Sequence, residues 1–332
     1  MKFFLATLIF AAAISPSRAL FFSGKWQEKM DKAAEAMAKG DYSGACGRYD
    51  ELISQNPPAK TAKLAYFGYG QCLEKKGEPD KALGIYHIGA RIYPSYAPVK
   101  IAMGSIYYSA GMYKEGIKVL GEVVEDEEDN IEARILLARC YERIGHLAGA
   151  ARHYEYVLHA DEYPHSSVIW GGYGLCLLKM GRAADAEKAF RQALAGMENN
   201  PDVWLWLAVS VFEQGRTKEA LNLLSGAEAL APSMTGIRLR KAFWLISDKR
   251  PGEAVETAKA ILSTDQLDSG ARLALALAFY SMGDKKRAAE EFEMASGSWE
   301  PCFSSQIAAR FLGAINNGSP AGNSDAPPKQ IP

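Results

Sequence analysis

The residues of this sequence that could carry chemistry are few, and the histidines come first. His146, His153, His159 and His165 lie close together, separated by seven, six and six residues. Two ligands on one face of a helix need a spacing of about four residues, so this pattern does not predict a metal site on a helix. The turn between the last two histidines leaves a metal-binding or pH-sensing role open, but the pattern favours scattered, solvated histidines.

The second candidate is the acidic run at 125–129. It lacks the alternating ligands and the glycine of a calcium loop, and Asp129 or Asn130 can cap a helix that follows it. The sequence also contains no phosphate loop, no HExxH, no GxSxG and no paired-cysteine metal motif. We therefore predict a protein that is not an enzyme, with no catalytic residue, no cofactor and no metal.

The net charge indicates which classes of partner to expect, and the first residues indicate where the chain works. The 38 basic and 39 acidic residues give a formal charge of -1, which provides no electrostatic reason to expect a nucleic acid or an anionic membrane as partner. Lys2, the apolar run 3–14 and the small residues up to Ala19 are typical of a signal peptide that is cut after Ala19. The apolar run is shorter than the roughly 20 residues that span a bilayer. We expect an exported chain, periplasmic or secreted, with no membrane span after cleavage; an uncleaved anchor is the alternative.

The helices that must position any functional side chain are clearest in residues 201–232. Two amphipathic segments meet at the turn 214–217, where Gly215 supplies the left-handed residue that ends a helix. Ala208 and Ala220, twelve residues apart, are small enough to let the two helix axes cross closely. Apolar side chains remain on both flanks of this pair, so the hairpin is stable only when it stacks on neighbours.

The same hairpin recurs along the chain. Small residues twelve positions apart mark each copy: Ala33/Ala45, Gly70/Ala82, Gly104/Gly116, Ala138/Ala150, Gly174/Ala186, Ala208/Ala220, Ala242/Ala254 and Ala276/Ala288. The first members follow one another at intervals of 37, 34, 34, 36, 34, 34 and 34 residues. The turn position is glycine in seven copies (Gly40, Gly77, Gly111, Gly145, Gly181, Gly215 and Gly283) and Lys249 in the remaining one.

A 34-residue period with small crossing residues, a turn glycine and a large residue such as Tyr86 or Phe190 in the second helix resembles the tetratricopeptide repeat (TPR) family, over about residues 26–302. The resemblance implies an all-α fold: a right-handed α-solenoid of about eight TPR helix hairpins, whose first helices line a concave groove that binds proteins or peptides. An apolar stripe with a polar outer side at 303–315 predicts a C-terminal capping helix.

These patterns give the domain organisation. A signal peptide (1–19) precedes a superhelix (20–316), and a disordered tail (317–332) rich in Gly, Ser, Pro and Asn follows it. We place the repeats near 26–59, 63–96, 97–130, 131–164, 167–200, 201–234, 235–268 and 269–302. In repeat seven Lys249 replaces the turn glycine, Lys241 stands at a usually apolar place and Ala258 replaces the large residue. We expect that repeat to be helical but loosely packed.

Five cysteines leave at least one without an intramolecular partner. Cys140 and Cys176 occupy the same place in successive repeats, where stacked helices lie about 8–10 Å apart, too far for a bridge. Cys46, late in the first repeat, and Cys72, early in the second, lie on helices that should touch. We predict a disulfide between Cys46 and Cys72, with buried free thiols as the alternative.

The stripe of each first helix that stacking does not use would line the groove. Towards the C-terminus this stripe is apolar, and towards the N-terminus it is polar. The candidate groove residues are Arg139, Arg143, Leu175, Leu178, Leu205, Trp206, Val209, Phe212, Phe243 and Tyr280. The lysine and asparagine with which the family clamps a terminal carboxylate are absent, since Phe67 and Gln71 stand at the first two such positions. The groove therefore suits an amphipathic helix or an apolar peptide, unless neighbouring repeats or the chain's own tail cover it.

Three functions are consistent with these features. The first is an exported TPR scaffold that binds a protein or peptide partner in its concave groove, within a cell-envelope assembly. The second is a non-catalytic accessory or regulatory subunit of an envelope enzyme. The third is a structural protein that assembles with itself through the apolar groove.

Overall fold

A computed structural model describes residues 24–160, 166–297 and 303–316. The predicted signal peptide and C-terminal tail lie outside these residues, as do His165 and Cys302. Within the described ranges the chain forms helices and turns without a strand, which confirms the predicted all-α class.

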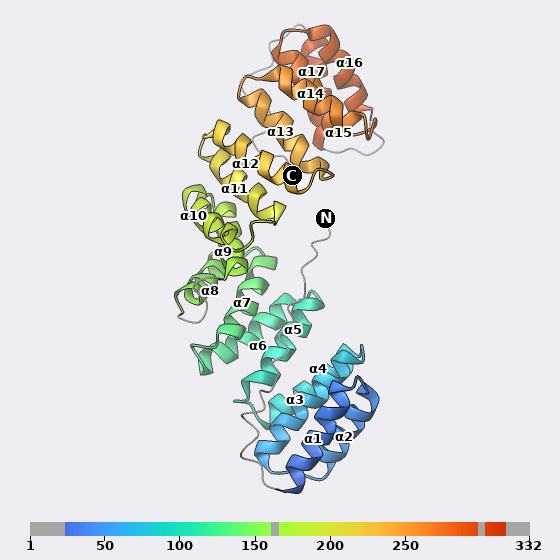
Figure 1. Ribbon diagram of the computed structural model, residues 1–332, viewed down its shortest axis with the longest axis vertical. Coiled ribbons are helices and arrows are strands. Elements are labelled where there is room, and N and C mark those ends of the chain that lie inside the picture. The colour runs from blue at the N-terminus through green and yellow to red at the C-terminus, as the bar shows by residue number, and fades with distance from the viewer. Residues whose placement is uncertain (1–23, 161–165, 298–302, 317–332) are drawn as a thin grey trace. The chain divides into compact units, whose positions relative to one another are not determined.

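Seventeen helices follow one another in the described residues (Figure 1). They are α1 (Lys25–Ala38), α2 (Tyr42–Ser54), α3 (Ala59–Lys75), α4 (Pro79–Ile92), α5 (Ala97–Ser109), α6 (Tyr113–Asp126), α7 (Ile131–Arg143), α8 (Leu147–His159), α9 (Ser167–Lys179), α10 (Ala183–Leu194), α11 (Pro201–Glu213), α12 (Thr217–Leu230), α13 (Thr235–Ser247), α14 (Pro251–Leu262), α15 (Ser269–Ser281), α16 (Lys285–Ser296) and α17 (Phe303–Asn316). Odd-numbered helices up to α15 are the first helices of the predicted hairpins, and even-numbered helices are the second.

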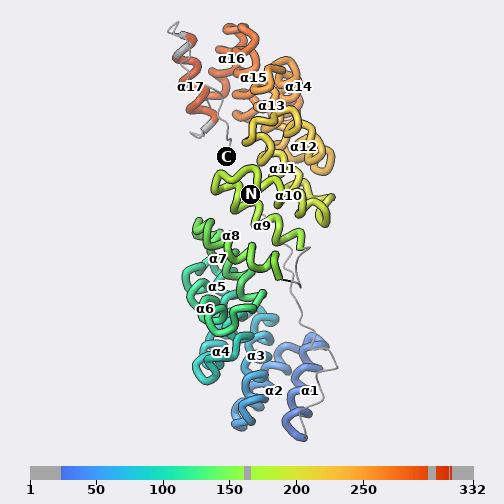
Figure 2. The backbone as a smooth tube through the Cα atoms, turned by 90° about the vertical axis from the view of Figure 1, so that its left-hand side faces the viewer, coloured from blue at the N-terminus to red at the C-terminus, as the bar shows by residue number. Residues whose placement is uncertain are grey.

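The helices fall into two units, Met1–Gly145 and His146–Pro332. In the first unit α1–α2, α3–α4 and α5–α6 form hairpins, and each second helix also packs on the next first helix. In the second unit α9 to α16 form four more hairpins in the same way, and α17 packs on α15 and α16, where a further first helix would lie. Figure 2 follows the backbone through these hairpins. Each unit contains its own apolar core.

The small residues that mark the repeats are buried, as their spacing predicts. Ala208 and Ala220, on α11 and α12, are both fully buried. At Gly104 on α5, an added Cβ atom would lie 2.6 Å from the Leu120 side chain of α6. Because that distance is far shorter than a van der Waals contact, the large residue of the second helix requires a small residue opposite it.

The turn of each hairpin depends on one residue in the left-handed region. The seven turn glycines have φ between 76° and 83°. After Gly215 the amide of Arg216 donates to the carbonyl of Val211, which closes the end of α11. Lys249 takes the same role with φ 60°, and the amide of Arg250 likewise donates to the carbonyl of Leu245. Repeat seven therefore keeps the turn at a backbone conformation that a lysine rarely adopts.

The expectation that repeat seven is loosely packed is wrong. Ala258 and Ile261 on α14 are fully buried, and Trp244 on α13 is 3% exposed. The indole of Trp244 stacks on Phe212 of α11, with ring centroids 4.4 Å apart. Lys241 is accommodated because its Nζ lies 2.6 Å from a carboxylate oxygen of Glu228 on α12.

Candidate functional site

The predicted apolar groove residues lie on the first helices of the second unit, and the structure separates them by exposure. Val209 and Phe243 are only 8% and 3% exposed, so they belong to the core and are not free to meet a ligand. Their burial corrects the predicted groove, because both side chains pack in the apolar core of the second unit. The other six lie partly buried against the core: Leu175, Leu178, Leu205, Trp206, Phe212 and Tyr280.

Two of these six aromatic or apolar side chains serve packing between hairpins. Phe212 lies parallel to Trp244, with 4° between the ring planes. Tyr280 on α15 meets Phe311 of α17 edge to face, at 5.6 Å between centroids. The side chains left for a partner are therefore those of α9 and α11, two first helices that contact each other: Leu175, Leu178, Leu205 and Trp206.

Two glycines on α9 differ in what surrounds them. A Cβ added at Gly172 would lie 2.9 Å from the ring of Tyr154, so that glycine makes room for an aromatic ring of α8. A Cβ added at Gly171 would meet nothing within 4 Å. Helix crossing therefore explains Gly172 but not Gly171. The absence of a side chain at Gly171 leaves open space on the helix surface one turn before Leu175.

In the first unit, the predicted groove residues Arg139 and Arg143 lie on α7. Arg139 is half-buried and Arg143 is exposed. The Nε of Arg143 donates a hydrogen bond of 3.0 Å to the hydroxyl of Tyr113, the first residue of α6. The sequence did not single out Tyr113, because a residue that begins a second helix lies outside the first-helix stripe.

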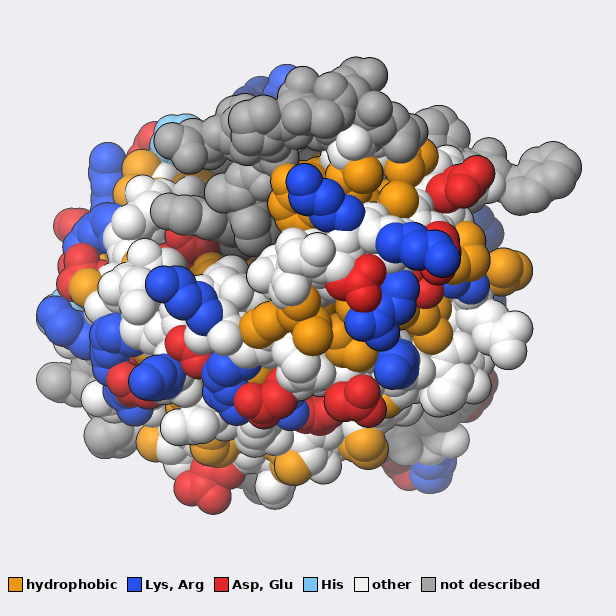
Figure 3. Space-filling view, turned by 90° about the horizontal axis from the view of Figure 1, so that it is seen from above, with side chains coloured by type: hydrophobic (Ala, Val, Ile, Leu, Met, Phe, Trp, Pro, Cys, Tyr) orange, Lys and Arg blue, Asp and Glu red, His pale blue; other side chains and the backbone are white. Residues whose placement is uncertain are grey.

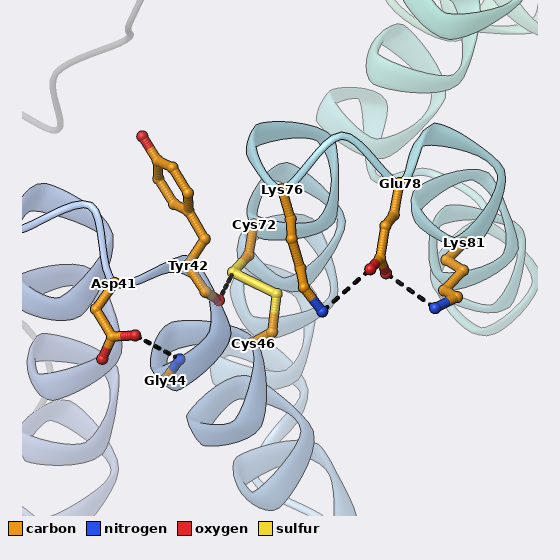
Figure 4. The surroundings of a disulfide bond; sticks show 8 residues. All are labelled: Asp41, Tyr42, Gly44, Cys46, Cys72, Lys76, Glu78 and Lys81. Atoms are coloured by element: carbon orange, nitrogen blue, oxygen red, sulfur yellow. Dashed lines mark hydrogen bonds and ion pairs between the residues drawn. A yellow bond between two sulfur atoms is a disulfide. The ribbon is translucent and has the colours of Figure 1, made fainter.

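Cys46 on α2 and Cys72 on α3 form a disulfide with their Cα atoms 5.7 Å apart (Figure 4). It joins the second helix of repeat one to the first helix of repeat two, where the two helices pack. The Sγ of Cys72 also lies 2.8 Å from the carbonyl oxygen of Tyr42. Cys140 is buried, and burial raises the pKa of its thiol to about 11, which makes it a poor nucleophile at neutral pH.

A hydrogen-bonded ion network joins repeats five and six. One carboxylate oxygen of Glu187 on α10 accepts from Arg191 at 2.7 Å, and the other accepts from Arg216 at 2.6 Å and from Gln214 at 2.8 Å. Burial by itself would raise the pKa of Glu187, but the hydrogen bonds from Gln214, Arg191 and Arg216 outweigh it and hold the pKa below its ordinary value. The network ties the turn after α11 to the preceding hairpin.

The pKa of a partly buried carboxyl group in repeat two is shifted in the opposite direction. The hydroxyl of Tyr86 on α4 donates to the carboxylate of Glu74 on α3 at 2.5 Å. Burial raises the pKa of Glu74 despite that hydrogen bond, and burial together with the charge of Glu74 raises the pKa of Tyr86. The pair fastens the hairpin, and the carboxylate is costly there when charged.

His159 and the residue that follows the acidic run make hydrogen bonds of a structural kind. The ring Nδ1 of His159 lies 2.7 Å from the carbonyl oxygen of Glu155. At the acidic run, Asn130 caps α7 by accepting from the amide of Ala133 at 3.0 Å. Within the described ranges no three His, Cys, Asp or Glu side chains are grouped to hold a metal ion.

Surface charge and helix length are the two features that bear on membrane contact. Figure 3 shows basic and acidic side chains interspersed over the visible face, in keeping with the near-zero formal charge of the sequence. Every helix in the part of the chain that the structure describes is too short or too polar to cross a bilayer.

Stacked hairpins with small crossing residues and left-handed turns define a class: the chain is a tetratricopeptide repeat protein. Residues 30–97 match the tetratricopeptide repeat. Residues 96–309, more than half of the chain, match the family described as the cilia and flagella-associated protein 70 C-terminal domain. The chain belongs to this family of TPR proteins.

Curated relatives and solved structures agree with that class. BBSome complex member BBS4 from Bos taurus is 22% identical over 232 residues, which are 69% of this chain and 44% of the relative. TPR repeat-containing protein YpiA from Bacillus subtilis is 25% identical over 154 residues, 44% of this chain and 36% of the relative. The chain thus spans less than half the length of these relatives. A tetratricopeptide repeat protein from Parabacteroides merdae superposes with a TM-score of 0.52 at 13% identity, over 88% of this chain and 99% of its own, a likeness of fold alone.

Proposed function

We propose that this chain is a non-catalytic scaffold that binds a protein or peptide partner along the first helices of its second unit. One observation carries the proposal: Leu175, Leu178, Leu205 and Trp206 stay partly exposed on two first helices that pack together. Other predicted groove residues of the second unit, Val209 and Phe243, are buried in its core. Apolar side chains left exposed together usually mark an interface.

The chemistry of this surface points to the kind of partner. A short apolar face with one indole suits the apolar side of an amphipathic helix, which would bury residues spaced by three and four. The open space at Gly171 gives such a segment room beside α9. The relative BBSome complex member BBS4 is by its name part of a complex, which supports a scaffold role for this chain as well.

We also propose that the chain works after export, within a cell-envelope assembly. The support is the sequence alone: a basic start, an apolar run and small residues up to Ala19. Amino-terminal sequencing of the chain purified from its native host tests this. We expect the mature protein to begin at Leu20, and a protein that still begins at Met1 contradicts cleavage.

The binding proposal is tested by crosslinking in intact cells of the native host. A photoreactive amino acid replaces Trp206, and the crosslinked partner is identified by mass spectrometry. In a separate capture experiment, the double variant Leu178→Ala with Trp206→Ala should lose that partner while its helicity is unchanged. Leu230 on α12 is exposed but lies on a second helix, so Leu230→Ala is the matched control. Equal capture by the double variant and the wild type would refute binding at this face.

Sedimentation of the mature chain tests self-assembly through the same face. A monomer at all concentrations is the expected result for a scaffold whose partner is another protein. A concentration-dependent oligomer that the double variant abolishes would instead assign the face to a second copy of this chain.

A further inference from the structure

Four side chains of the first unit gather on α5, α6 and α7. Arg143 donates to the Tyr113 hydroxyl at 3.0 Å, and its guanidinium carbon lies 5.4 Å from the centroid of the same ring. The ring of Tyr108 meets that of Tyr113 edge to face, at 5.7 Å between centroids. Burial raises the pKa of Tyr108, and the positive charges of Arg139 and Arg143, one turn apart on α7, oppose the rise.

These four side chains have hydrogen-bond donors that no described residue uses. Within the described residues no carboxylate lies within ion-pair distance of Arg139 or Arg143, and neither tyrosine hydroxyl donates a hydrogen bond. Other arginines that link helices behave differently. Arg216 and Arg272, for example, meet carboxylate oxygens of neighbouring second helices at 2.6 and 3.1 Å. Arg143 links α7 to the preceding hairpin through Tyr113 alone, so no described carboxylate neutralises the charges of this pair.

We propose that Arg139, Arg143, Tyr108 and Tyr113 form a binding site for the carboxylate side chains of an acidic peptide segment. The inference rests on the proposed function, since it takes the ligand to be a peptide, and it adds the chemical class of one part of that ligand. We call these four residues the arginine–tyrosine cluster.

The geometry prepares the cluster for an anion. Arg139 and Arg143 are four residues apart on one helix, so their side chains lie on the same face. The hydrogen bond to Tyr113 and the contact with its ring orient the guanidinium of Arg143 before any ligand arrives, which reduces the entropy lost on binding. Because the Tyr113 oxygen accepts from Arg143, its own proton remains available for a carboxylate oxygen.

A carboxylate fits this cluster better than a phosphate or a nucleic acid. The hydrogen bond to Tyr113 is the main cause of the raised pKa of Arg143, and the negative charge of the adjacent Glu142 adds to it. That charge would oppose a dianion more strongly than a single carboxylate. Two arginines are also far fewer than the basic stripe that tracks a nucleic-acid backbone.

The test is a titration of the full chain with a short, fluorescent oligo-glutamate peptide that is acetylated and amidated at its ends, followed by fluorescence anisotropy at low salt. We expect binding that weakens as salt is added. Arg139→Gln and Arg143→Gln should each weaken it roughly tenfold, as the loss of a charge-assisted hydrogen bond predicts. Tyr113→Phe should weaken it less, because the guanidinium charge remains.

Arg91 provides the matched control. It is exposed on α4 of the same unit, so Arg91→Gln removes the same charge from a different face and should leave the affinity unchanged. Circular dichroism of each variant, with its thermal midpoint, separates a lost contact from a lost fold. Should a glutamine variant unfold, Arg143→Lys replaces it, since lysine keeps the charge but not the guanidinium fork.

Several results would overturn the arginine–tyrosine cluster as a carboxylate site. An equal loss of affinity in Arg91→Gln would show that the effect is one of overall charge. Equal binding of a capped oligo-glutamine would show that carboxylate side chains are not needed, and tighter binding of a phosphoserine peptide would make phosphate the better ligand. Binding of an oligo-glutamine with a free C-terminus would assign the site to a terminal carboxylate. The proposed function is judged separately. If capture still depends on Trp206 while oligo-glutamate does not bind, only the carboxylate site fails; if oligo-glutamate binds but capture does not depend on Trp206, the fault lies with the proposed apolar face.

Discussion

The two units of this chain are built from the same hairpin but differ on the side that their first helices leave uncovered. In the first unit this side holds Tyr108, Arg139 and Arg143; in the second it holds Leu205 and Trp206. The crossing residues and the turns hardly differ between the units, because they are set by the contact between two helices. The uncovered stripe is not used by that contact, so one repeat architecture can present two chemistries.

The units also differ in how neighbouring repeats are joined. In the first unit a disulfide links α2 of repeat one to α3 of repeat two. In the second unit an aromatic stack links α11 to α13, and an ion network surrounds Glu187. Repeats one and two are therefore joined by a covalent bond, whereas repeats five to seven are joined by aromatic packing and charge.

The largest effect that follows from this comparison is expected at the aromatic stack. Trp244→Ala removes a 3% exposed indole from the core of the second unit and should lower the free energy of unfolding by about 4 kcal/mol. Trp206→Ala, on the preceding first helix, is the control, since Trp206 is partly exposed and should cost much less. Urea unfolding measures both. Similar losses in the two variants would show that Trp206 belongs to the core, which would weaken the proposed binding face.

The next effect concerns the disulfide of the first unit. Reduction opens a link between residues that are 26 positions apart, and the chain entropy regained by the unfolded state should cost about 3 kcal/mol of stability. Hydrogen exchange should show faster exchange in α1 to α3 after reduction. Helices α9 to α16 serve as the internal control, and equal acceleration there would mean that the effect of the disulfide is not confined to its unit.

Acid should act in opposite directions at one carboxyl group of each unit. The folded pKa of Glu187 lies below its ordinary value, so its contribution is present at neutral pH and is lost as pH falls through that folded pKa. The folded pKa of Glu74 lies above its ordinary value, so the folded state binds the proton more tightly and this site gains stability as pH falls towards about 4.5.

Two variants separate these contributions in urea unfolding at pH 7 and pH 4. Glu187→Gln should cost about 1 kcal/mol at neutral pH, a modest figure because its arginine partners are nearly half exposed, and less in acid. Glu74→Gln keeps an acceptor for Tyr86 and removes the buried charge, so it should stabilise the chain at neutral pH and have little effect in acid. Two variants that respond alike would remove this difference between the units.

The parts of the fold that follow a one-dimensional pattern could be predicted from the sequence. Crossing residues twelve apart, a turn glycine and the 34-residue period place each hairpin, because stacking repeats the same contact along the chain. The adjacency of Cys46 and Cys72 also follows from the order of helices. None of these inferences needs a distance between side chains.

The site could be predicted only in part, because exposure depends on how closely neighbouring helices approach. The stripe that holds Leu205 and Trp206 also holds Val209, and only the packing reveals that Val209 is buried. Trp244 lies outside the stripe, yet its indole stacks on Phe212 and covers one face of that ring. Likewise, Tyr113 begins a second helix, and its contact with Arg143 crosses from one repeat to the next.

The smallest effect tests whether the turns are indeed the constant part of both units. Lys249 holds φ 60° where seven other turns have glycine, and a side chain in that region costs about 1 kcal/mol. Its side chain makes no hydrogen bond or ion pair with any described residue, so Lys249→Gly removes nothing that stabilises the fold. Glycine also increases the entropy of the unfolded chain, which offsets part of the gain.

We therefore expect Lys249→Gly to raise the free energy of unfolding by about 0.5 kcal/mol. The mirror variant Gly215→Lys, at the turn of the preceding repeat, should lower it by about 1 kcal/mol. Hydrogen exchange at the end of α13 and at the end of α11 locates each change. If Lys249→Gly destabilised the chain, the lysine would be serving a contact of its own, and repeat seven would differ from the other repeats in its turn as well as in its packing.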